Sequence, residues 1–101
     1  MIIKIKYIDD FHIIVMSEKE YWRDYSYVMR GKQRKKVLLI LDGPALVSEI
    51  KGKTNLSLAE TSRVLRGLVE QGLAECKNPE DHLGRVYGLT DKGYNLQKKI
   101  K

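Results

Sequence analysis

The chain begins with two short apolar runs separated by charged residues. Residues 1–16 are rich in isoleucine and valine, and Lys4 and Lys6 alternate with apolar residues, as on a strand with one exposed face. Asp9 and Asp10 between the runs predict a tight turn, although the glycine that hairpin turns favour is absent. The pattern predicts a strand or hairpin that forms an extension ahead of the main domain.

The remaining residues alternate helical periodicity with turn signals. Ser17 with Glu20 three residues later is a capping-box pattern that predicts a helix continuing to Arg30. A second helix is predicted over 32–41, and the following residues 42–44 (Asp-Gly-Pro) are a strong stop signal. The further predicted elements are a brief helix at 47–53, a helix at 57–71, strands at 73–77 and 85–89, and a helix at 90–101.

Composition limits the class of protein. A chain of 101 residues fits a single domain with one modest core. Its hydrophobic fraction of 43% and mean hydropathy of −0.40 are ordinary for a folded soluble protein. No apolar run approaches the roughly 18 residues needed to span a bilayer. The single cysteine, Cys76, allows no internal disulfide, so the sequence predicts a cytoplasmic protein that does not associate with a membrane.

The distribution of charge is uneven along the chain. Residues 1–30 hold five basic and five acidic residues, whereas residues 31–101 hold 14 basic and 8 acidic ones. The whole net charge of +6 therefore belongs to the larger segment. Such an excess suggests an anionic partner such as nucleic acid, or simply a lysine-rich surface.

Two short helices joined by a tight turn form a helix-turn-helix, and a two-stranded hairpin directly after them makes a winged helix. The residues that carry a resemblance are Val47-Ser48-Glu49-Ile50, Thr54-Asn55-Leu56-Ser57, Ser62-Arg63-Val64-Leu65, Leu68-Val69-Glu70-Gln71-Gly72-Leu73, Asn78-Pro79-Glu80-Asp81, Gly84-Arg85-Val86-Tyr87 and Leu89-Thr90-Asp91-Lys92-Gly93. This stretch, about residues 34–94, resembles winged-helix transcriptional regulators of the MarR and ArsR type. The expected fold is mainly α with a small β-hairpin (α+β). A strand or hairpin extension at residues 1–16 precedes a winged helix-turn-helix domain at 17–101, which includes an extra N-terminal helix and flanking dimerisation helices.

The helix at 57–71 has two distinct faces. A buried stripe is predicted at three- and four-residue spacing from Thr61, Val64, Leu65 and Leu68. The opposite face carries Ala59, Glu60, Arg63, Arg66 and Gly67. A helix that enters a major groove needs this arrangement, and Arg63 is suited to pair with guanine or with a phosphate. Glu60 is expected to cap the helix together with Ser57, whose neighbouring amides suit a phosphate.

The loop at 78–85 is the expected wing. Arg85 at its tip is suited to enter a narrow minor groove, and Lys77 on the other strand would lie near phosphates. An ordinary surface arginine on a stable hairpin is the alternative. The predicted DNA-binding residues are Ser57, Ala59, Glu60, Ser62, Arg63, Arg66, Lys77 and Arg85.

Two residues depart from the pattern of the resembled families. Leu46 stands where such regulators often place a serine or threonine N-cap, and Gly52 interrupts the short helix that follows. A lost cap and an interior glycine each cost about 1 kcal/mol, so this helix is expected to be looser than usual.

The first predicted helix carries more aromatic surface than a small core requires. Tyr21, Trp22, Tyr25 and Tyr27 are distributed around it, which favours a partner, since aromatic residues dominate protein interfaces. A homodimer interface formed with the terminal helix is expected, with closure of a single chain's core as the alternative. The predicted interface residues are Tyr21, Trp22, Tyr25, Tyr94, Leu96 and Ile100.

The sequence analysis thus predicts a homodimeric, sequence-specific regulator that binds double-stranded DNA and acts as a repressor. The main alternative is a winged helix that binds another protein, and the next is a small thiol enzyme using Cys76. Because Cys76 and His82 lack an orienting group and oxyanion donors nearby, we expect no enzyme activity. Adding His12 gives no convincing metal site, and no cofactor is predicted. Whether a small effector or oxidation of Cys76 regulates the protein stays open.

Overall fold

The computed structural model describes residues 4–8, 13–81 and 84–101. The chain starts with an antiparallel pair of strands, β1 (Lys4–Ile8) and β2 (Ile13–Ser17), in which Lys4 lies opposite Ser17. The predicted hairpin pattern is therefore confirmed for its two strands. The predicted turn at Asp9 and Asp10 lies outside the described residues.

The main domain follows the predicted order of elements, each within one residue of its predicted bounds at either end. The elements are α1 (Glu18–Met29), α2 (Lys32–Ile40), β3 (Ala45–Leu46), α3 (Val47–Thr54), α4 (Leu58–Glu70), β4 (Ala74–Cys76), β5 (Val86–Leu89) and α5 (Asp91–Ile100). Strand β3 is the element that periodicity did not predict, because two residues are too short to show a pattern.

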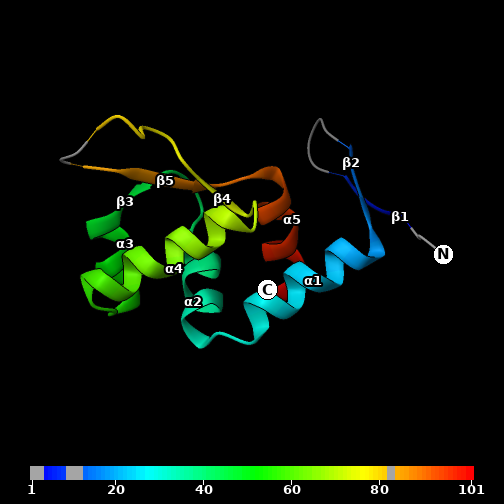
Figure 1. Ribbon diagram of the computed structural model, residues 1–101, viewed down its shortest axis with the longest axis horizontal. Coiled ribbons are helices and arrows are strands. Elements are labelled where there is room, and N and C mark those ends of the chain that lie inside the picture. The colour runs from blue at the N-terminus through cyan, green and yellow to red at the C-terminus, as the bar shows by residue number, and fades with distance from the viewer. Residues whose placement is uncertain (1–3, 9–12, 82–83) are drawn as a thin grey trace.

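The three short strands form one antiparallel sheet in the order β3-β5-β4. Ala45 pairs with Tyr87 on one side of β5, and Ala74 pairs with Leu89 on the other. Asn55, in the left-handed conformation at φ 64°, ends α3 and turns the chain toward α4. The hairpin of β4 and β5 lies beside α3 and α4, so helix-turn-helix and hairpin form one side of the molecule (Figure 1).

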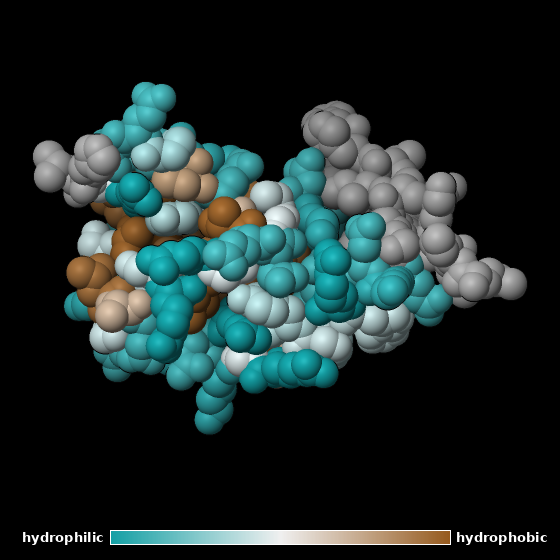
Figure 2. Space-filling model, viewed as in Figure 1, coloured by the Kyte–Doolittle hydropathy of each residue, from teal (hydrophilic) through white to brown (hydrophobic). Residues whose placement is uncertain are grey.

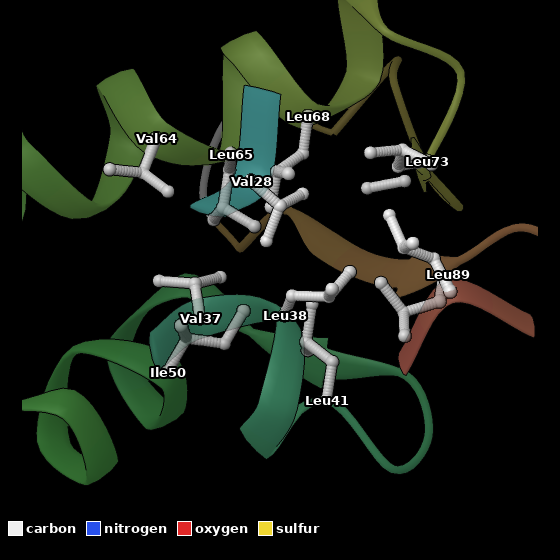
Figure 3. Close-up of a cluster of buried hydrophobic side chains, with 12 residues drawn as sticks. Val28, Val37, Leu38, Leu41, Ile50, Val64, Leu65, Leu68, Leu73 and Leu89 are labelled. Carbon is white, nitrogen blue, oxygen red and sulfur yellow. The ribbon is translucent and has the colours of Figure 1, made fainter. Parts of the chain in front are cut away.

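The core lies between the helices and the small sheet (Figure 3). Its fully or nearly buried side chains come from α1 to α5 and from both strands of the hairpin: Val28, Val37, Leu38, Leu41, Ile50, Val64, Leu65, Leu68, Leu73, Ala74, Leu89 and Leu96. The predicted stripe of α4 is confirmed, since all four of its residues are buried. Burial of this stripe leaves the opposite face of α4 on the surface.

Close contacts with the backbone of Gly72 and Leu73 fix α5 against the end of α4. The hydroxyl of Thr90 donates to the carbonyl of Gly72 at 2.7 Å, and Gly72 itself has a φ of +75° that favours glycine. Gly93 in the first turn of α5 packs so closely on the carbonyl of Leu73 that a Cβ there would overlap it. A glycine is therefore required where α5 crosses the chain leaving α4.

Polar side chains join α5 to the other helices. The buried Gln97 donates from Nε2 to the carbonyls of Leu38 and Leu41, at 2.8 and 3.0 Å. These two carbonyls belong to the C-terminal end of α2, where helical partners are missing. Lys92 Nζ lies 2.9 Å from Oδ2 of the buried Asp24, and this ion pair joins α5 to α1.

The start of α3 is better supported than the sequence suggested. Leu46 supplies no side-chain cap, as its hydrocarbon side chain dictates. The backbone N–H of Leu46 nevertheless donates to Oε1 of Glu49 at 3.1 Å, and Val47 N–H donates to the carbonyl of Arg85 at 3.3 Å. Glu49 and the carbonyl of Arg85 thus support the start of α3 where a serine cap is absent, while the expected looseness of this helix stays a prediction.

Candidate nucleic-acid interface

Ser57 and Glu60 begin α4 as a cap. The Ser57 hydroxyl accepts a hydrogen bond from the backbone N–H of Glu60 and donates to Glu60 Oε1, both at 3.1 Å. The carboxylate is therefore engaged with the first turn of the helix, as the sequence analysis favoured. A carboxylate at a helix N-terminus also interacts well with the helix dipole.

The outer face of α4 carries the predicted side chains. Ala59, Arg63 and Arg66 are exposed, and Ser62 is half-buried. Gly67 differs from the prediction, because the hydroxyl of Tyr27 lies directly over it and a Cβ would collide there. The helix therefore offers arginines on its surface while α1 covers its glycine.

A groove of about 570 Å³ separates α4 from the wing. Ser62 and Arg66 line it from α4, and Arg85 lines it from the start of the returning strand. Its floor is apolar, with Leu58 exposed by 57% and Val69 by 37%. Figure 2 shows this mixture as brown surface between the wing and α4, bordered by teal side chains.

Arg63 is exposed on the side of the outer face of α4 that lies away from the groove. It lines a second cavity, of about 310 Å³, together with Tyr27 of α1 and Arg34 of α2. Arg66 lines this cavity as well as the groove beside the wing. The exposed face of α4 is therefore bordered by basic side chains on both sides, with Arg66 between them.

The wing is held together by one asparagine. Asn78 Nδ2 donates to the carbonyl of Gly84 at 2.8 Å, and its Oδ1 accepts from the N–H of Val86 at 2.6 Å. These bonds close the base of the loop without using the side chain of Arg85. That side chain is exposed and makes no hydrogen bond or ion pair within the part of the chain that the structure describes, so it remains available to a ligand.

Lys77 is less available than the sequence suggested. Its ammonium group forms an ion pair with Glu75, two residues earlier in strand β4. That hydrogen bond to Glu75 raises the pKa of Lys77 above its ordinary value of 10.5. Lys77 is exposed and fully charged at neutral pH, but the neighbouring carboxylate reduces its net attraction for a phosphate.

The predicted interface residues do not form one exposed face. Trp22 is 51% exposed, whereas Leu96 is only 3% exposed and belongs to the core of the single chain. The other four, Tyr21, Tyr25, Tyr94 and Ile100, are partly buried against that core. Met29, one residue that the sequence analysis overlooked, is 41% exposed and lies two helical turns after Trp22.

Cys76 is half-buried, and its thiol donates to Asn78 Oδ1 at 3.8 Å. An amide oxygen cannot take the thiol's proton, so this contact does not activate it as a nucleophile. His12 and His82, the two histidines considered with it, lie outside the described residues. Within the described part of the chain, no helix combines the length and apolar character that a bilayer crossing requires.

No protein-family model matches the chain, and no curated protein matches it either. Several solved structures match this chain. A mutant of MarR from E. coli complexed with operator DNA has a TM-score of 0.62 at 24% identity, covering 81% of this chain and 61% of that one. The homodimeric DNA-binding domain Mb0332 from Mycobacterium bovis, a possible ArsR-family regulator, has a TM-score of 0.65 at 19% identity, covering 81% and 76%.

A possible HxlR-family transcriptional factor from Thermoplasma volcanium has a TM-score of 0.65 at 18% identity, and the match covers 96% of this chain and 87% of that one. The chain is a winged helix-turn-helix protein. Its fold resembles those of the MarR and ArsR regulators, as the sequence predicts. This chain spans about three fifths of the length of MarR. A structural match at 24% identity shows the fold alone, so the function has to be argued from the surface of this chain.

Proposed function

We propose that this winged-helix chain is a transcriptional regulator that binds specific sequences of double-stranded DNA. Helix α4 would read the major groove, and the wing at residues 78–85 would contact the minor groove or the sugar–phosphate backbone. We propose that this regulator is a repressor, which would act by occupying a promoter and excluding RNA polymerase.

The observation that carries this proposal is the position of Arg66 and Arg85 on the two sides of one groove. One arginine belongs to the exposed face of α4 and the other to the wing. A helix and a hairpin that present cations to the same space are suited to a major groove and the backbone beside it. The net charge of +6 adds a long-range attraction for DNA.

Arg63 is the residue best placed to read bases. It is exposed on the outer face of α4, and no hydrogen bond or ion pair holds its side chain within the described residues. An arginine in a major groove pairs with O6 and N7 of guanine through two parallel hydrogen bonds. The MarR structure complexed with operator DNA supports the use of this fold for binding DNA.

We further propose that the regulator is a homodimer. Trp22 and Met29 expose apolar surface along one edge of α1, and Trp22 contacts both Tyr21 and Tyr25 edge to face, with ring centroids 5.0 and 5.6 Å apart. A rigid aromatic cluster of this kind suits the centre of an interface. The homodimeric Mb0332 domain supports the same assembly.

Sedimentation velocity at micromolar concentration tests the dimer. The unaltered chain is expected to sediment as a dimer, and Trp22→Asp is expected to sediment as a monomer with unchanged circular dichroism. A chain that sediments as a monomer before any substitution contradicts the proposal.

Selection of bound sequences from a random duplex library tests the function. The expected result is an enriched pseudo-palindrome whose half-sites lie about one helical turn, roughly 34 Å, apart. Arg63→Ala should retain binding but lose the preference at one base pair of each half-site. A library that returns no enriched sequence contradicts specific recognition.

A second candidate function is favoured by the apolar floor of the groove. Leu58 and Val69 are exposed there, and DNA offers little apolar surface to cover them. A winged helix that binds another protein would use such a floor. Its affinity for duplex DNA would be weak and nearly independent of salt, because few phosphates would be contacted.

A further inference from the structure

Helix α1 separates its charges onto different faces. Lys19, Arg23, Ser26 and Arg30 follow one another at spacings of four, three and four residues, so they lie along one face of the helix. The three cations of this row are exposed. By contrast, Asp24 is buried and ion-paired with Lys92 at 2.9 Å, while Arg23 Nε lies 3.6 Å from its other oxygen. The neutral charge balance of residues 1–30 therefore conceals a basic helix face.

This face borders a cavity of about 440 Å³ that continues toward α4. Lys19, Arg23, Arg30 and Arg34 line it together with Gln71, the C-cap of α4. Trp22 also lines it, so the cavity borders the proposed dimer interface as well. None of the described residues that line it is acidic. Four cations around one open cavity form a surface suited to phosphate groups.

Tyr27 and Arg34 connect this cavity to the flank of α4. Both residues also line the 310 Å³ cavity that contains Arg63. Arg34 is fixed in place, because it donates to the carbonyl of Tyr27 at 2.8 Å and its guanidinium lies 4.0 Å from the centre of the Tyr27 ring. The Tyr27 hydroxyl in turn lies over Gly67 of α4. Basic side chains thus continue from α4 to α1, with Glu70 the one acidic residue among the described residues that line the connecting cavity. Figures 1 and 2 show the two helices on the same face of the molecule.

The dimensions of DNA indicate what this surface meets. A helix with its side chains is about 10–12 Å wide, which nearly fills a major groove about 12 Å across. The two phosphate backbones must therefore run along the two flanks of a helix that lies in the groove. The wing lies on one flank of α4, and the basic face of α1 with Arg34 lies on the other.

We propose that the α1 face formed by Lys19, Arg23 and Arg30, with Arg34, binds the sugar–phosphate backbone on the side of α4 opposite the wing. This inference rests on the proposed function and extends its contact surface to a helix that the sequence analysis assigned only to dimerisation. The contacts are to phosphates, so they strengthen binding to every sequence equally.

The test compares two double variants of the full chain that each remove two positive charges. Lys19→Gln with Arg30→Gln alters the basic face of α1 and leaves the pair of Arg23 with Asp24 intact. Lys98→Gln with Lys99→Gln alters α5 as the matched control. The dissociation constant for a random-sequence duplex is measured by fluorescence anisotropy at several salt concentrations. Circular dichroism and the urea midpoint establish that each variant is folded.

We expect the α1 variant to lower the slope of log affinity against log salt by about 1.8, since each lost phosphate contact removes about 0.9. The α5 control should leave the slope unchanged. Lys19→Arg with Arg30→Lys should show the slope of the unaltered chain, because it keeps both charges. Equal slopes for the α1 variant and the control overturn the inference even when the unaltered chain binds duplex DNA. Absence of any duplex binding by the unaltered chain overturns the proposed function together with it.

Discussion

Arg66 of α4 and Arg85 of the wing line the same groove, although 18 residues lie between them in the sequence. The hydrogen bonds of Asn78 that close the wing, and the pairing of β5 with β3 and β4, hold this relationship in place. Neither arginine side chain has a hydrogen-bond or ion-pair partner among the described residues. Two unpaired cations facing one space are the basis of the proposed DNA interface.

Removal of either arginine should weaken duplex binding without unfolding the chain. We expect Arg66→Ala and Arg85→Ala each to reduce affinity roughly tenfold at low salt, a loss of about 1.4 kcal/mol, which lies within the range typical of a direct contact. Fluorescence anisotropy with a labelled duplex measures the effect. Lys36→Ala, which removes an exposed charge from α2, is the control. If both arginine variants bind as tightly as this control, the assigned DNA face is wrong.

Glu75 should oppose DNA binding because it holds Lys77. Because the pKa of Lys77 is raised in the folded chain, the ion pair stabilises the fold fully below pH 10.5. This stabilisation is lost as the pH rises through the pKa of Lys77 in the folded chain. The pair is therefore intact at neutral pH. Glu75→Gln should lower the pKa of Lys77 toward 10.5 and free its charge for a phosphate. The salt slope should then rise by about 0.9. An NMR titration of the Lys77 side chain follows the pKa, and a slope at or below the original contradicts this role of Glu75.

Two glycine substitutions should change stability in opposite directions. Gly93→Ala forces a Cβ against the carbonyl of Leu73, and such overpacking costs about 1–3 kcal/mol. Gly52→Ala, in the exposed middle of α3, meets nothing within 4 Å and should stabilise the chain by about 1 kcal/mol. Urea unfolding measures both. Equal midpoints for the two variants would mean that α5 does not pack on Leu73 as described.

Gln97 should contribute to stability through its two backbone acceptors. Gln97→Leu keeps a side chain of similar size but leaves the carbonyls of Leu38 and Leu41 without their donor, at a cost of about 2 kcal/mol. Gln33→Leu makes the same change at an exposed position of α2 and should shift the unfolding free energy by less than about 0.5 kcal/mol. Thermal or urea unfolding distinguishes the two, and similar losses for both variants would contradict the role of Gln97.

The order and bounds of the elements were predictable because the local signals are strong. The capping pair Ser57 and Glu60 predicts the start of α4, and Gly72 predicts its end. The buried stripe of α4 followed from helical spacing alone. Strand β3 was missed because its pairing with β5 is a tertiary contact, which leaves no periodic pattern in two residues.

The candidate site was only partly predictable for a similar reason. The exposure of Arg63, Arg66 and Arg85 was expected from the motif, but the coverage of Gly67 by Tyr27 depends on how α1 crosses α4. Leu96 was predicted to lie at the dimer interface, whereas in the structure its side chain is buried in the core of the single chain. The basic face of α1 had a readable signal in the spacing of residues 19, 23 and 30, which the zero net charge of that segment obscured.

The salt dependence of duplex binding tests the central claim most directly. Cations lie on both sides of the exposed face of α4. About six phosphate contacts would reduce affinity for a random-sequence duplex by roughly 10³-fold between 50 and 200 mM salt. Fluorescence anisotropy across this range gives the value for the unaltered chain. A steep, linear fall of log affinity with log salt is the predicted result. An affinity that changes by less than about twofold across the same range would contradict a winged helix that binds DNA through α4 and the wing.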